Sequence, residues 1–132
     1  MRVVWVLLLF SLGCSAASPL EIHLVDQMKS WQKRLGLDDW NMTLQVVRQS
    51  EIDPNAWGAA HWDEDAKTAT IQVLDPRDYN LKGTDLRLDM ECTIVHELVH
   101  IQISPLGYPS LQAREDVVNK IMNAVLNHPC PN

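Results

Sequence analysis

The sequence predicts a small α+β domain, and three observations lead to this prediction. An alternating stretch and a hairpin pattern occupy residues 40–74. Helical periodicity precedes and follows them, at residues 18–35 and 110–126. Between the hairpin and the last helix lies an apolar helical stretch with the sequence His96-Glu97-Leu98-Val99-His100. The chain has 132 residues, which is enough for one domain and too short for two ordinary ones.

Residues 1–17 have the pattern of a secretory signal peptide. Arg2 precedes an apolar run over residues 3–12, and small residues follow it. About ten apolar residues are too few to span a bilayer. We therefore expect an exported protein, secreted or periplasmic, whose single domain covers residues 18–132. The alternative is a lipoprotein anchored through Cys14, because Leu12-Gly13-Cys14 resembles the end of a bacterial lipoprotein signal.

The chain is acidic, with a formal net charge of −6 and no basic stripe. This balance argues against binding to nucleic acid or to an anionic membrane surface, and we expect a monomer. If Cys14 leaves with the signal peptide, Cys92 and Cys130 remain as a pair. They can form a disulfide in an oxidising compartment, and the sequence leaves open whether they do.

The first expected element is a supporting helix that begins near Ser18. Ser18 is the cap, Pro19 lies in the first turn and Glu21 completes a capping box. Gly36 ends the helical run. Apolar side chains recur at helical spacing and predict one core-facing side, made of Leu24, Val25, Met28, Trp31 and Leu35.

Three strands are expected next, in a short and mostly antiparallel sheet. Residues 40–47 alternate between polar and apolar, and residues 56–62 and 68–74 flank an acidic turn as a hairpin. The run Gly58-Ala59-Ala60 would let a peptide backbone approach a strand edge. His61 is either a surface residue of this strand or a substrate contact. The tail at His128 is expected to be frayed.

The central helix carries the residues with the clearest chemistry. Residues four apart on a helix lie on the same face, so His96 and His100 can bind one zinc ion through neutral imidazole. Glu97 lies near enough to contact a metal-bound water without binding the metal. Thr84 or Asp85 can cap this helix. Its apolar residues spread round most of the circumference, which predicts burial: Ile94, Val95, Leu98, Val99, Ile101 and Ile103.

The last helix offers two acids for the third ligand position. Glu115 falls on an apolar arc and Asp116 on a polar arc that also holds Asn119. An acid on an apolar arc is costly unless something pairs with it, and a zinc ion would do so. We therefore expect Glu115 to be the third zinc ligand. The alternative is that Glu115 is favoured in the first turn by the helix dipole alone.

The pattern His96-Glu97-x-x-His100, followed by a glutamate on the next helix, resembles the gluzincins, the thermolysin-like zinc peptidases. The short gap over residues 101–114 is most similar to the compact minigluzincin type. The resemblance covers the chain from about residue 40 to residue 126, and only the HExxH motif is specific. It implies a small zincin-like domain in which a glutamate-bearing C-terminal helix closes the site, with His96, His100 and Glu115 on zinc and Glu97 as general base.

The same resemblance suggests further roles and a function. In thermolysin-like enzymes a tyrosine from the corresponding loop helps hold the oxyanion, which makes Tyr108 a second catalytic candidate, with loop packing as the alternative. The expected function is zinc-dependent endopeptidase activity on a peptide or unfolded protein, with Glu97 acting on a zinc-bound water. The alternative is an idle scaffold that binds a peptide or protein partner around a structural zinc. The intact Glu97 argues against that alternative, because a structural site does not need this acid.

Overall fold

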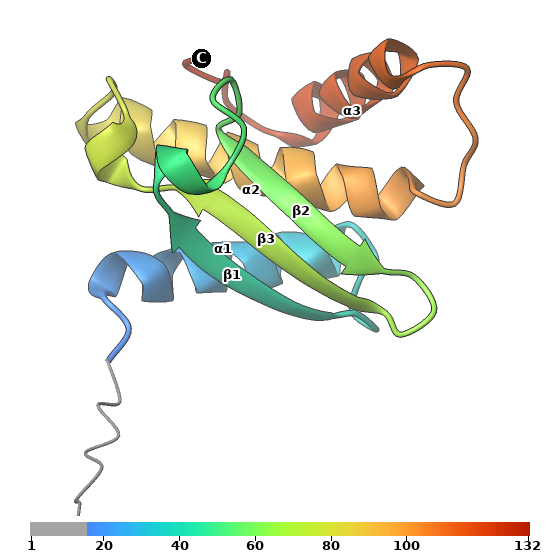
Figure 1. Ribbon diagram of the computed structural model, residues 1–132, viewed down its shortest axis with the longest axis horizontal. Coiled ribbons are helices and arrows are strands. Elements are labelled where there is room, and N and C mark those ends of the chain that lie inside the picture. The colour runs from blue at the N-terminus through green and yellow to red at the C-terminus, as the bar shows by residue number, and fades with distance from the viewer. Residues whose placement is uncertain (1–15) are drawn as a thin grey trace, which may run out of the picture.

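The computed structural model describes residues 16–132, and over this range it confirms a small α+β fold (Figure 1). Residues 1–15, which hold Cys14 and most of the expected signal peptide, lie outside the described residues. No helix among the described residues is long and apolar enough to cross a membrane. The elements are α1 (Pro19–Arg34), β1 (Asn41–Val47), β2 (Gly58–Asp63), β3 (Thr68–Leu74), α2 (Gly83–Ile103) and α3 (Leu111–Val125).

The sheet is mixed, which corrects the expectation of a mostly antiparallel one. Its strand order is β1-β3-β2, with β3 antiparallel to β2 and parallel to β1. The predicted hairpin is present as β2 and β3. Polar and apolar alternation predicts which side of a strand is buried but not which strand lies next to it, so the placement of β1 beside β3 could not be derived from it. β2 is therefore an edge strand.

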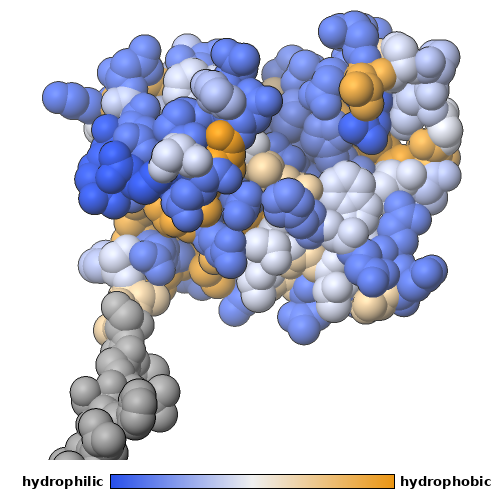
Figure 2. Space-filling model, viewed as in Figure 1, coloured by the Kyte–Doolittle hydropathy of each residue, from blue (hydrophilic) through white to orange (hydrophobic). Residues whose placement is uncertain are grey.

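The sheet has one buried and one solvent-exposed face. Ala69, Ile71 and Val73 of β3 are buried on the inner face, against which α1 and α2 pack. The outer face is polar, with Asn41 and Thr43 of β1 exposed. Figure 2 shows that the surface on this side is largely hydrophilic. The third helix, α3, packs on α2 rather than on the sheet.

The helix ends follow the predicted chemistry in α1 and depart from it in α2. Ser18 accepts a hydrogen bond from the Glu21 backbone N–H (3.2 Å), and Gly36 adopts a left-handed conformation with φ of +72°. By contrast, α2 begins at Gly83, so neither Thr84 nor Asp85 caps it. Gly83 has a φ of +60°, a left-handed conformation that glycine adopts readily. The helix therefore begins one residue before Thr84.

The C-terminal segment, residues 126–132, is held along α2 and is not the frayed tail that we expected. A disulfide joins Cys92 to Cys130, which answers the question that the sequence left open. The His128 Nε2 atom lies 3.0 Å from Glu91 Oε2. Asp89 Oδ1 accepts a hydrogen bond of 3.1 Å from the backbone N–H of Asn132. All three attachments lie in one turn of α2, just before the HExxH motif.

Candidate metal centre

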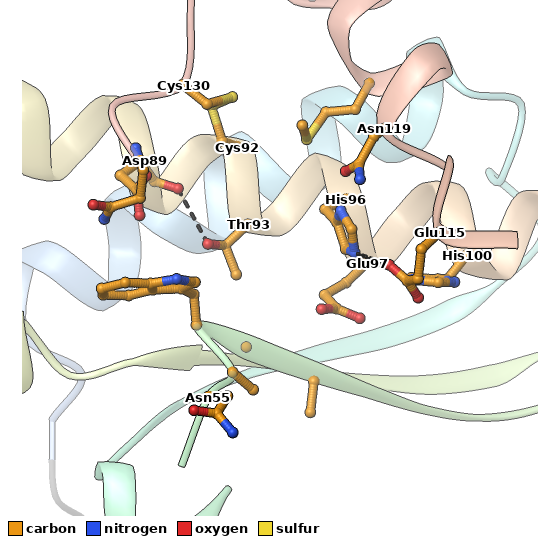
Figure 3. A pocket seen from close by; sticks show the side chains of 16 residues that line it. Asn55, Asp89, Cys92, Thr93, His96, Glu97, His100, Glu115, Asn119 and Cys130 are labelled. Atoms are coloured by element: carbon orange, nitrogen blue, oxygen red, sulfur yellow. Dashed lines mark hydrogen bonds and ion pairs between the residues drawn. A yellow bond between two sulfur atoms is a disulfide. The ribbon is translucent and has the colours of Figure 1, made fainter. Parts of the chain in front are cut away.

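The first two donor atoms of the centre come from one face of α2. This helix is apolar around most of its circumference, and Ile94, Val95 and Leu98 are fully buried. Burial on those sides directs His96 and His100 toward α3, as Figure 3 shows. Their Nε2 atoms are 3.2 Å apart. The predicted spacing of four residues therefore brings two imidazole nitrogens to one point.

The third donor atom comes from Glu115 on α3, as we expected. Its Oε2 atom lies 3.2 Å from His96 Nε2, and its Oε1 atom lies 3.0 Å from His100 Nε2. The helix starts just upstream, where Ser110 accepts a hydrogen bond from the Ala113 backbone N–H. Asp116 instead points to solvent and accepts a hydrogen bond of 2.9 Å from Gln112 Nε2. The helical arc thus separated the two acids correctly.

The spacing of these donor atoms fits a metal ion. The ligand atoms of His96, His100 and Glu115 all lie within 4.8 Å of one another. In a tetrahedral site with metal–ligand bonds of 2.0–2.1 Å, two donor atoms are about 3.3 Å apart, close to the distances above. The exposed fraction of the side chain rises from 9% in His100 to 24% in His96 and 39% in Glu115. The cluster can therefore bind a metal ion and is open on one side.

Burial also sets the protonation of the groups around the cluster. It lowers the pKa of His100, which favours the neutral imidazole that coordinates a metal. Burial, together with the nearby carboxylate of Glu115, raises the pKa of Glu97 to about 8. A bound divalent cation would lower the pKa of Glu97 again, because an opposite charge favours the ionised carboxylate. Both shifts are what a site built around a cation would show in its absence.

The cluster lies in a groove with a volume of about 500 Å³. One wall is the chain that enters and begins β2, and the other wall is α3 with the C-terminal segment (Figure 3). One stripe of α2 forms the floor. The lining residues are Asn55, Ala56, Trp57, Gly58, Ala59, Asp89, Cys92, Thr93, His96, Glu97, His100, Glu115, Asn119, Met122, Cys130 and Asn132.

Gly58 has a packing role in the fold. A Cβ atom at this position would meet Thr93 Cγ2 at 2.4 Å and the Gln72 carbonyl oxygen at 2.6 Å. The missing side chain therefore lets β2 lie close against α2. Among residues 16–132, β2 pairs only with β3, so its other edge has no partner strand in this range and lies beside the groove.

The structure does not bring Tyr108 or His61 into this groove. Tyr108 lines a separate hollow together with Trp62 and Arg114. His61 is exposed on the outer face of the sheet, opposite Thr70 of β3. His61 is thus the surface strand residue that was one of the two interpretations of the sequence, and the role of Tyr108 as a helper stays a prediction.

Two residues that line the groove were not identified from the sequence as part of the site. Asp89 lies four residues before Thr93, which lies four before Glu97, so one helical stripe joins them. Extending the motif backwards at this spacing would have found Asp89. Asn119 lies one turn after Glu115, is exposed as its polar arc predicts, and also lines the groove. Comparison of the chain with known protein families, with curated proteins and with solved structures finds no match.

Proposed function

We propose that the protein is a zinc-dependent endopeptidase in which His96, His100 and Glu115 bind the metal and Glu97 is the general base. The observation that carries the proposal is the convergence of two imidazole nitrogens and a carboxylate at distances of 3.0–3.2 Å, with a second carboxylate alongside. The resemblance of the motif to the gluzincins supports the same assignment.

The donor set favours zinc among the common metal ions. Two neutral imidazoles and one carboxylate are typical of catalytic zinc sites, which keep a fourth position open. Calcium and magnesium prefer shells made of oxygen atoms, and usually more of them. A structural zinc site would be closed by a fourth protein ligand. Among residues 16–132, the only group of three or more metal-ligating side chains is this triad.

Glu97 is placed to move protons during hydrolysis. When bound, zinc supplies a Lewis acid and brings the pKa of a coordinated water toward neutrality. The Glu97 carboxylate forms no ion pair with residues 16–132, so it would be free to accept a proton from the attacking water. It would then pass the proton to the amide nitrogen that leaves. Water is added across the peptide bond, and Glu97 returns to its starting state.

The free edge of β2 suits an extended peptide as substrate. Its unpaired backbone groups run beside the groove, where a substrate strand can pair with them. An unfolded protein or a flexible peptide offers such a strand. The disulfide between Cys92 and Cys130 supports a place in an oxidising compartment, consistent with an exported enzyme that is either secreted or periplasmic.

The proposal is tested on the protein purified from an oxidising host. Elemental analysis measures the bound metal, and a peptide library together with a denatured protein measures cleavage. We expect zinc in the protein and cleavage that a chelator abolishes and added zinc restores. A fully zinc-loaded protein that cleaves none of these substrates would instead be the idle scaffold with a structural metal.

A further inference from the structure

The floor of the groove continues beyond the metal centre to a buried acid. Thr93 and Asp89 lie one and two turns of α2 before Glu97, and both line the groove. Figure 3 shows Asp89 at one end of the site and Glu115 at the other. Asp89 is only 3% exposed. The groove therefore has a second polar end that the proposed reaction does not use.

Asp89 has no cationic partner among the described residues. Within residues 16–132, no Lys, Arg or His side chain forms an ion pair with it. Among the described residues, its carboxylate accepts one hydrogen bond, from the backbone N–H of Asn132. Burying an ionised carboxylate without a cationic partner is costly. A cation that entered the groove would remove that cost.

One aromatic residue lines this end of the groove, and a second packs behind it. The Trp57 ring lines the groove and remains 38% exposed. It packs against the ring of Tyr79, with centroids 5.1 Å apart. Tyr79 is only 8% exposed and is not among the residues that line the groove. The carboxylate of Asp89 and the indole face of Trp57 are suited to a cation.

We infer that Asp89 and Trp57 form a subsite for a lysine or arginine side chain of the substrate. The inference rests on the proposed peptidase function and names the sequence preference of the same groove. Asp89 lies seven residues before His96 on α2, which is ~10 Å along the helix axis. An extended peptide advances about 3.3 Å per residue, so the basic residue lies about three residues from the bond that is cut.

A purely structural role for Asp89 is the rival explanation, because it holds the backbone of Asn132. Other contacts also attach the C-terminal segment to α2. The C-terminal segment is also attached by the Cys92–Cys130 disulfide and by the contact of His128 with Glu91. Glu91 is not among the residues that line the groove. It therefore provides a matched control: an acid in the same turn of α2, attached to the same segment, with no access to substrate.

The test compares two peptides that differ in one charge. A cleaved peptide is first scanned with lysine at each position, and the best lysine peptide is then paired with its norleucine counterpart. We expect kcat/KM of the zinc-loaded protein to be at least about tenfold higher for the lysine peptide than for the norleucine peptide. A factor of about ten corresponds to the low end of what a hydrogen bond to a charged group contributes. The position at which lysine is preferred should lie about three residues from the cleaved bond. Asp89→Asn, whose side-chain oxygen still accepts a hydrogen bond from the Asn132 backbone, should reduce the ratio of the two kcat/KM values to near one.

One further variant separates binding from architecture: Glu91→Gln should keep the lysine preference of the wild type. Equal cleavage of both peptides by the wild type, or the same loss of preference in Glu91→Gln, would overturn the subsite while leaving the peptidase proposal intact. If neither peptide is cut, the peptidase proposal fails, and calorimetric binding of the two peptides decides whether the subsite exists.

Discussion

The carboxylate of Glu115 on α3 lies 3.0 Å from the Nε2 atom of His100 on α2, although the two residues belong to different helices. The contact joins α2, which carries the HExxH motif, to α3, which carries the following acid. Because the neighbouring acid, Asp116, points to solvent, substitution of each acid in turn can show which one binds the metal.

The purified protein should contain about one zinc ion per chain, and the loss of a ligand should release it. We expect Glu115→Ala to lose metal and activity. Asp116→Ala is the matched control and should keep both, with a change in the free energy of unfolding of about 0.5 kcal/mol or less. A paired zinc titration of the two variants makes the comparison. Metal loss in Asp116→Ala, or full occupancy in a His96→Ala, His100→Ala double variant, would contradict the assigned site.

Glu97→Gln should keep zinc and folding and lose at least about a hundredfold in kcat, since proton transfer by a positioned base contributes that much or more. The chelated variant should unfold at the same temperature as the chelated wild type or a higher one, because a half-buried carboxyl without an ion-pair partner has been replaced. Thermal unfolding and peptide hydrolysis measure the two effects. Turnover at the wild-type rate would exclude Glu97 as the base.

Gly58→Ala should destabilise the protein by about 1–3 kcal/mol, the usual cost of overpacking. The new Cβ would meet a backbone carbonyl of β3 as well as the Thr93 side chain, and the backbone cannot easily yield. Denaturant unfolding gives the free energy. Gly107→Ala is the control, because a Cβ there meets nothing within 4 Å. Equal stability of the two variants would mean that β2 does not lie against α2 as described.

Replacing both cysteines, as in Cys92→Ala with Cys130→Ala, should cost about 3–4 kcal/mol of unfolding free energy. The disulfide spans 38 residues of sequence, and a loop of that length restricts the unfolded chain by this amount. Denaturant unfolding of the chelated proteins measures the loss. Reduction of the wild type should have a similar effect. An unchanged midpoint after reduction would show that the C-terminal segment contributes no constraint.

His128 should make the stability of the C-terminal segment depend on pH. Its pKa is raised by a hydrogen bond with the Pro129 carbonyl and by Glu91, with burial opposing them. A raised folded-state pKa means that the stabilisation is fully present below the unfolded value of about 6.5 and is lost as the pH rises through the folded value. The difference in melting temperature between chelated wild type and chelated His128→Gln should therefore be larger at about pH 5.5 than at about pH 8.5. The same difference at both pH values would rule out this linkage.

The parts of the structure that follow from local chemistry were predictable. The cap at Ser18, the alternation in β1 and the helical arc that carries Glu115 each depend on residues that are close in sequence. The parallel pairing of β1 with β3 could not be predicted, because it depends on which strand the hairpin places in the middle. The exposure of His61 was one of the two interpretations of the sequence, whereas the hollow that Tyr108 lines could not be predicted, because the path of a loop is set by packing over the whole domain.

Residues 111–132 contact α2 near both of their ends, at Glu115 in the candidate metal centre and at Cys130 in the disulfide. Under the proposed function the first attachment depends on metal supply, and the second depends on redox potential. With either one removed, the other would still hold the segment beside the groove, together with buried side chains such as Val118. Metal loss and reduction together should therefore loosen this wall of the groove more than either condition alone.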